Sequence, residues 1–172
     1  FVDVYTGQGP RSADDHAGCW AAPVAGTRFL HAFGTGNTFL GLNAGNFTLT
    51  GSDNTAVGED ALRANTEGDF NTAVGEDALD SNTEGDRNTA VGQDALQSNT
   101  TGNLNTAVGE DALYYNTEGH RNTAVGQDAL DSNTTGNDNT AVGHTALSAN
   151  TSGGQNTAVG DDALYSNTGD HN

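Results

Sequence analysis

An aspartate recurs every 17 residues along much of the chain, and this spacing is the clearest pointer to chemistry in the sequence. The series comprises Asp60, Asp77, Asp94, Asp111, Asp128 and Asp162, with Thr145 in the place where a seventh would fall. Carboxylates stacked at the separation of neighbouring β-strands, about 4.8 Å, repel one another, and Ca²⁺ relieves such repulsion with oxygen ligands. These six aspartates are therefore the candidate metal ligands, as a calcium ladder.

The alternative is that each aspartate lies in a solvated turn, where its carboxylate caps a local backbone N–H. The nine-residue motif of calcium-binding β-rolls, GGxGxDxUx, does not occur in the chain. We therefore favour the turn, and calcium is the one ion that we keep as a candidate cofactor.

Threonine recurs with the same period in two series. The first series is Thr55, Thr72, Thr89, Thr106, Thr123, Thr140 and Thr157. The second is Thr66, Thr83, Thr100, Thr117, Thr134, Thr151 and Thr168. A flat array of hydroxyls suits ice or a glycan, although threonine in a ladder is also an ordinary strand or turn residue.

Nothing in the sequence predicts catalysis. An active site needs one irregular set of groups, such as a nucleophile with its base, whereas near-identical repeats offer the same groups many times. Asp14, Asp15, His16 and Cys19 lie close together, but no second Cys or paired His accompanies them, so a structural role is favoured over a metal site. We predict a protein that is not an enzyme.

These residues are positioned by a unit of 17 residues that begins at Asn54 and occurs seven times up to residue 172. Numbering the places of the unit from that asparagine, Asn-Thr-Ala-Val-Gly at places one to five is invariant, as are Ala at eight, Leu at nine and Asn-Thr at twelve and thirteen. Places six, ten, sixteen and seventeen vary. Such a chain is a stack of coils that bury their apolar faces against one another.

Two glycines per unit, with recurring Asn and Thr, disfavour helix, and short strands around Thr-Ala-Val and Ala-Leu are expected. The predicted fold is all-β, a parallel β-solenoid or β-roll of 17-residue coils that rises by about 4.8 Å per coil. We expect the valines at place four and the leucines at place nine to form two buried aliphatic ladders. The asparagines at places one and twelve suit amide ladders that close the turns.

The chain divides into three parts. Residues 1–27 do not repeat, residues 28–53 contain a degenerate repeat at 37–53 next to a cap, and residues 54–172 hold the seven regular repeats. Phe1, Val2, Val4 and Trp20 are candidates to cover an open end of the stack. They either fold back on their own first coil or cover the last coil of the next molecule, which would build a head-to-tail filament.

The net charge restricts the binding partners that we expect for this protein. Asp and Glu number 23 against 5 Lys and Arg, a net charge of −18, so nucleic acid and anionic membranes are poor partners. No run of 18 apolar residues predicts a membrane span. One Val and one Leu per coil make a thin core, from which we expect a homo-oligomer.

The phrases FLHAFGTGNTFLGLNAGNFTLTGSDNTAVG at 29–58 and NTAVGxDALxxNTxG resemble repeats of bacterial surface and phage tail-fibre-type proteins. They are also similar to the head repeats of trimeric autotransporter adhesins, which are β-rolls. This resemblance covers residues 29–172 and implies a homotrimer of parallel rolls. It implies an extracellular, cell-surface function as a rigid spacer or adhesive rod, with a host surface or glycan as partner.

Overall fold

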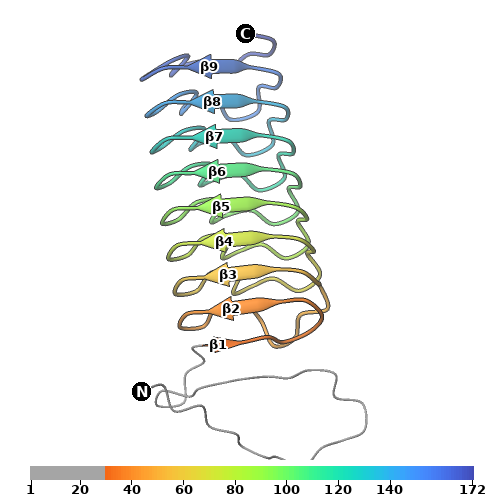
Figure 1. The fold of residues 1–172 in the computed structure, drawn as a ribbon. Helices are drawn as coiled ribbons and strands as arrows, with labels where there is room; N and C mark the ends of the chain where they lie inside the picture. The colour runs from red at the N-terminus through yellow and green to blue at the C-terminus, as the bar shows by residue number, and fades with distance from the viewer. Residues whose placement is uncertain (1–29) are drawn as a thin grey trace, which may run out of the picture.

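The computed structural model describes residues 30–172, which form a column of nine short strands in one sheet (Figure 1). The strands are β1 (Leu30–His31), β2 (Thr38–Leu40), β3 (Thr55–Val57), β4 (Thr72–Val74), β5 (Thr89–Val91), β6 (Thr106–Val108), β7 (Thr123–Val125), β8 (Thr140–Val142) and β9 (Thr157–Val159). Each strand pairs with the next in chain order. Strands β2 to β9 are parallel, and β1 runs antiparallel to β2. The predicted all-β parallel solenoid is confirmed; the predictions for residues 1–27 lie outside the described residues.

Strands β3 to β9 consist of three residues each, because in the regular coils only the Thr-Ala-Val segment has the β-branched character that favours extended backbone. The register advances by one repeat at each step, so that Thr55 pairs with Thr72, Ala56 with Ala73 and Val57 with Val74. The degenerate repeat at 37–53 joins the same stack through β2, where Phe39 replaces the alanine.

The Ala-Leu segment was expected to be a second strand, and this expectation is wrong. It lies in a turn, and the leucine at place nine has a left-handed backbone, with φ of 53° at Leu79. The Leu79 N–H nevertheless donates to the Ala95 carbonyl of the next coil at 3.0 Å. Coil-to-coil hydrogen bonding therefore continues around the turn without strand geometry.

The interior is made of alanine and leucine rather than valine and leucine. Ala at places three and eight and Leu at place nine are almost completely buried in the regular coils, apart from the last coil. The expected leucine ladder is confirmed, but the expected buried valine ladder is wrong, because Val74, Val91 and Val108 are each 37% exposed. Side chains alternate along a strand, so Thr and Val share the outer face while the alanine between them points inward.

Asparagines complete the interior, as the sequence predicted. At place twelve, the Asn82 Nδ2 donates to the Asn65 Oδ1 of the preceding coil at 2.9 Å and to the Gly85 carbonyl at 3.0 Å. At place one, the Asn71 backbone N–H donates to the Asn54 Oδ1 at 2.8 Å, and its Nδ2 donates to the Gly85 carbonyl. Both ladders therefore satisfy buried polar groups and close the coil.

The glycine at place five allows neighbouring coils to approach. Gly75 has φ of 143°, and a Cβ built on it would lie 2.2 Å from the Gly92 carbonyl oxygen. No other residue type fits such a position.

The last coil is one residue shorter than the others. Asn172 donates its N–H to the Asn156 Oδ1 at 3.0 Å, and its carbonyl accepts from Thr157 at 2.8 Å, as a place-one asparagine does elsewhere. Residue 172 therefore occupies the first place of a further coil, and the deletion falls at place fourteen. In the described part of the chain, Asn150 Oδ1 is consequently a buried acceptor without a donor, since Asn167 bonds to Gly169 instead.

Candidate interaction surface

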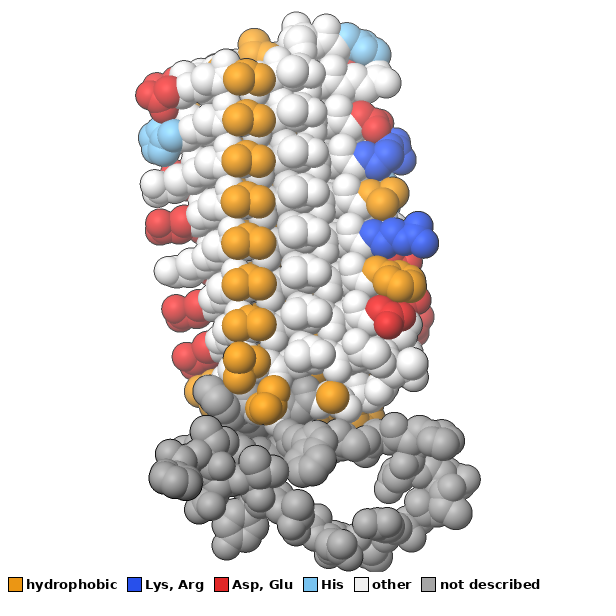
Figure 2. Space-filling view, in the orientation of Figure 1, with side chains coloured by type: hydrophobic (Ala, Val, Ile, Leu, Met, Phe, Trp, Pro, Cys, Tyr) orange, Lys and Arg blue, Asp and Glu red, His pale blue; other side chains and the backbone are white. Residues whose placement is uncertain are grey.

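The outer face of the sheet presents two regular columns of side chains, which we call the Thr–Val face. It is formed by places two and four of β3 to β9: Thr55, Thr72, Thr89, Thr106, Thr123, Thr140, Thr157, Val57, Val74, Val91, Val108, Val125, Val142 and Val159. The valines make a continuous apolar stripe along the rod (Figure 2). A stripe of this kind on a surface is typical of an interaction site.

The fold of one chain accounts for this face less completely than for the other invariant places: strand geometry favours β-branched residues at places two and four but does not require Thr and Val in particular. The other invariant places have a structural reason: burial for Ala and Leu, amide ladders for Asn and close backbone approach for Gly. The threonines at place two are half-buried from β3 to β8, and the valines at place four are half-buried or exposed. Both are identical in all seven copies, whereas most exposed places vary.

The two threonine series have different roles. The hydroxyls at place thirteen bond to the next coil, as in Thr66 Oγ1 to the Thr83 carbonyl at 3.1 Å and Thr100 Oγ1 to the Thr117 carbonyl at 3.0 Å. They hold the stack together and do not form a hydroxyl array facing solvent. The threonines at place two are the ones on the outer face, where each lies beside the valine of the same strand.

The six candidate calcium ligands lie in turns at the edge of the coils. Their backbones are left-handed, with φ between 53° and 57° at Asp60, Asp77, Asp94, Asp111, Asp128 and Asp162. Aspartate adopts this conformation more readily than most residues, which gives a structural reason for the series. Burial, reinforced by neighbouring carboxylates, raises the pKa of Asp77 and of Asp111 above the ordinary value.

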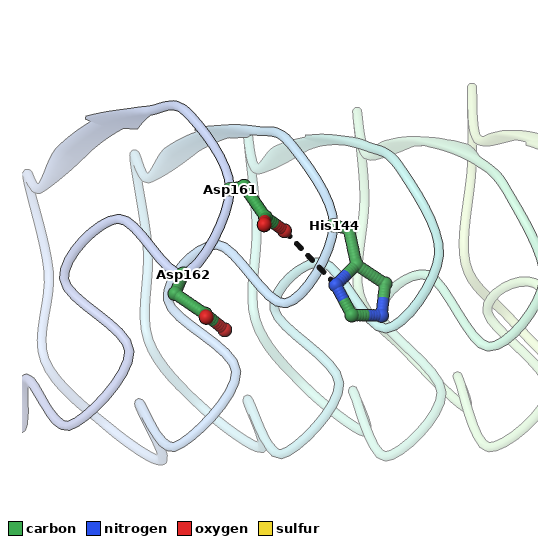
Figure 3. A group of neighbouring side chains, drawn as sticks. All are labelled: His144, Asp161 and Asp162. Carbon is green, nitrogen blue, oxygen red and sulfur yellow. Dashed lines mark hydrogen bonds and ion pairs between the residues drawn. The ribbon is translucent and has the colours of Figure 1, made fainter.

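One trio in the described residues brings three metal-ligating side chains together, and it includes only one member of the aspartate series. His144, Asp161 and Asp162 place one ligand atom each within 4.8 Å of one another (Figure 3). His144 Nδ1 lies 3.0 Å from Asp161 Oδ1, and Asp162 accepts a hydrogen bond from the Thr145 hydroxyl. All three side chains are exposed, and the hydrogen bonds from His144 to Asp161 and from Thr145 to Asp162 account for their proximity. The calcium ladder stays a prediction.

Two of the three arginines in the described residues are paired with carboxylates of the next coil. Arg63 makes a bidentate contact to Asp80, with Nε at 2.8 Å and Nη2 at 2.9 Å, and Arg121 makes a similar contact to Asp138. Arg87 has no carboxylate within ion-pair distance in this part of the chain, and its guanidinium lies 5.7 Å from the centre of the Phe70 ring.

Sequence reasoning missed a hydrogen-bonded ladder at place sixteen, one of the places whose residue type varies between coils. The side chains of Asp69, Asp86, Asn103, His120, Asn137 and Asp170 each accept the backbone N–H of place sixteen in the preceding coil, at 2.5 to 2.9 Å. Asp, Asn and neutral His share an acceptor atom at similar reach, and this shared property was the available signal.

No protein-family model, curated protein or solved structure matches the chain. In residues 30–172, no helix is long and apolar enough to span a membrane.

Proposed function

We propose that the chain is a non-catalytic structural rod whose Thr–Val face packs against the same face of other copies. The observation that carries this proposal is the invariance of two outward-facing places whose side chains one chain leaves partly exposed. A second copy is the natural occupant because its ladders have the same period along the rod, so that each coil meets an equivalent coil.

Charge supports the same occupant. The chain carries a net charge of −18, and two copies repel each other wherever carboxylates meet. The Thr–Val face has no ionisable side chain, so it is the surface along which copies approach at the least electrostatic cost. Burying columns of valine supplies the driving force, at about 25 cal/mol for each Å² of apolar surface removed from water.

We further propose that the rod serves outside the cell, as a spacer or an adhesive shaft, with three copies in the assembly. The resemblance of residues 29–172 to surface and tail-fibre-type repeats supports this setting, and the acidic surface suits a highly soluble exterior protein. Labelling intact producing cells with an antibody against the rod tests the location. Labelling that needs permeabilised cells would contradict it.

The self-association itself is tested by sedimentation velocity on a variant with Val74, Val108 and Val142 all changed to Asp. These places lie in alternate coils, so the new charges are separated by about 9.6 Å along the rod. We expect the variant to be monomeric with an unchanged circular dichroism spectrum, because the valines are on the outer face, while the wild type is a multimer.

The matched control adds three charges on another side of the rod. Thr101, Thr135 and Ser152 occupy place fourteen, where other coils carry Glu, and changing all three to Glu should leave the multimer intact. A wild type that is monomeric at every concentration, or a valine variant that associates like the wild type, would overturn the proposed function.

A further inference from the structure

The Thr–Val face has two different edges. Place six follows each valine by two residues and forms the acidic edge: Glu59, Glu76, Gln93, Glu110, Gln127, His144 and Asp161. Place seventeen precedes each threonine by two residues and forms the arginine edge: Asp53, Phe70, Arg87, Leu104, Arg121, Asp138 and Gln155. Figure 2 shows the apolar stripe with mainly red side chains along one side and with blue, orange and red ones along the other.

The two edges differ in charge. The acidic edge has four carboxylates and no arginine. The arginine edge holds two of the three arginines in the described residues, alternating with exposed Phe70 and Leu104, and it has an aspartate towards each end, Asp53 and Asp138. Arg87 is exposed and, within residues 30–172, has an aromatic ring rather than a carboxylate as its neighbour. In so acidic a chain, a cation without an acidic partner is available to bind a carboxylate of another molecule.

The direction in which two copies run decides which edges meet. If the copies are related by a rotation axis along the rods, their axes are parallel, and the arginine edge of one lies opposite the acidic edge of the next. If they are related by an axis across the rods, each edge lies opposite its own copy. With the two rods fully overlapped, Glu110 then faces Glu110, Glu59 faces Asp161 and Arg87 faces Arg121, which is unfavourable.

We propose that the copies pack with parallel axes, and that Arg87 of one copy reaches across one coil spacing to Glu76 and Glu110 of its neighbour. Arg121, which also holds Asp138 of its own chain, adds a second contact to the same edge. The inference rests on the proposed function, since it presupposes that the Thr–Val faces associate. Valine supplies most of the affinity, whereas the edges select the orientation, because charges at the rim of an interface contribute more to specificity than to strength.

A charge-swap series tests the pairing, with dissociation constants measured by sedimentation equilibrium and the fold checked by circular dichroism. Arg87→Glu with Arg121→Glu makes both edges acidic and should weaken association by about tenfold or more. Glu76→Arg with Glu110→Arg should weaken it similarly, since cations then face cations. The quadruple variant restores opposite charges across the contact and should return the dissociation constant close to that of the wild type.

The outcomes separate this inference from the function on which it rests. A wild type that never associates overturns the proposed function. A wild type that associates, but whose quadruple variant is no stronger than either double variant, overturns the edge pairing alone. Stronger association of the Glu76→Arg, Glu110→Arg variant would also overturn it, because the added cations would then not face the arginines of the neighbouring copy.

Discussion

At the scale of the residue, each three-residue strand points its middle side chain inward and the other two outward. The neighbouring pair Ala107 and Val108 shows this arrangement. Ala107 is completely buried, and Val108 is 37% exposed. Hydrophobicity alone favours the opposite arrangement. The narrow coil favours alanine, because the space between the strand and the opposite turn is already filled by the leucine and alanine of that turn.

The first prediction compares aspartate at these two positions. Ala107→Asp places an unpaired charge in the core and should lower the free energy of unfolding by about 3–5 kcal/mol. Val108→Asp should change it by less than about 1 kcal/mol, measured by urea unfolding at a concentration where the chain is monomeric. Equal losses from the two substitutions would contradict the inward and outward assignment.

The second prediction concerns Asp131, a half-buried carboxylate whose pKa is raised from 3.8 to about 6, chiefly by burial and then by repulsion from Asp128 and Asp111. The folded state holds its proton more tightly than the unfolded state does. The contribution of Asp131 to stability is therefore most favourable below about pH 4 and is lost as the pH rises to about 6.

Asp131→Asn removes this titration. The variant should be more stable than the wild type at pH 7, by about 1 kcal/mol after allowance for solvent screening, and the difference should vanish towards pH 4. Asp138→Asn is the control of opposite sign, because the hydrogen bond from Arg121 lowers the pKa of Asp138. A stability difference for Asp131→Asn that does not change with pH would contradict the assignment.

At the scale of the element, the side-chain ladder at place sixteen joins each coil to the next, and its members have only an acceptor atom in common. The ladder at place sixteen is interrupted once, at Gly154, which has no side chain to accept the Asn137 N–H. The Gly154 backbone does not have a positive φ, and a Cβ added there would lie 3.0 Å from the Asn137 carbonyl oxygen. The site thus admits a side chain with a small local adjustment.

The third prediction follows from this gap. Gly154→Asn should supply the missing acceptor and restrict the unfolded chain, and so raise the free energy of unfolding by about 1 kcal/mol. Gly154→Ala restricts the chain without supplying an acceptor, and it isolates the hydrogen-bond contribution in thermal unfolding. Asn and Ala variants of equal stability would show that the ladder adds nothing at this position.

The sequence predicted the features that follow from the 17-residue period. It missed those that depend on whether a side chain points into the coil or out of it. The 17-residue spacing determines the register of β3 to β9, and the invariant Asn and Leu indicate burial. A strand as short as Thr72–Val74 leaves the inward face undetermined, because two alternations fit it equally well. The ladder at place sixteen was not predicted because Asp86, Asn103 and His120 differ in residue type, although each accepts a backbone N–H of the preceding coil.

At the scale of the whole molecule, a stack of equivalent coils has a stability that is close to a sum over coils and their interfaces. The fourth prediction is that deleting residues 88–104, one complete repeat, leaves a folded rod that is shorter by about 4.8 Å. Deleting only 88–96 shifts every later place and should unfold the chain, as judged by circular dichroism. Unfolding by the complete-repeat deletion would contradict the equivalence of the coils.

The central claim is that copies of this rod associate side by side through the Thr–Val face, and small-angle X-ray scattering of the wild type over a concentration series tests it most directly. Scattering gives mass, length and cross-section together. We expect a mass that is a multiple of 17.5 kDa, with the length of a single rod and a larger cross-section. A single-chain mass at all concentrations, or growth in length at constant cross-section, would contradict the claim.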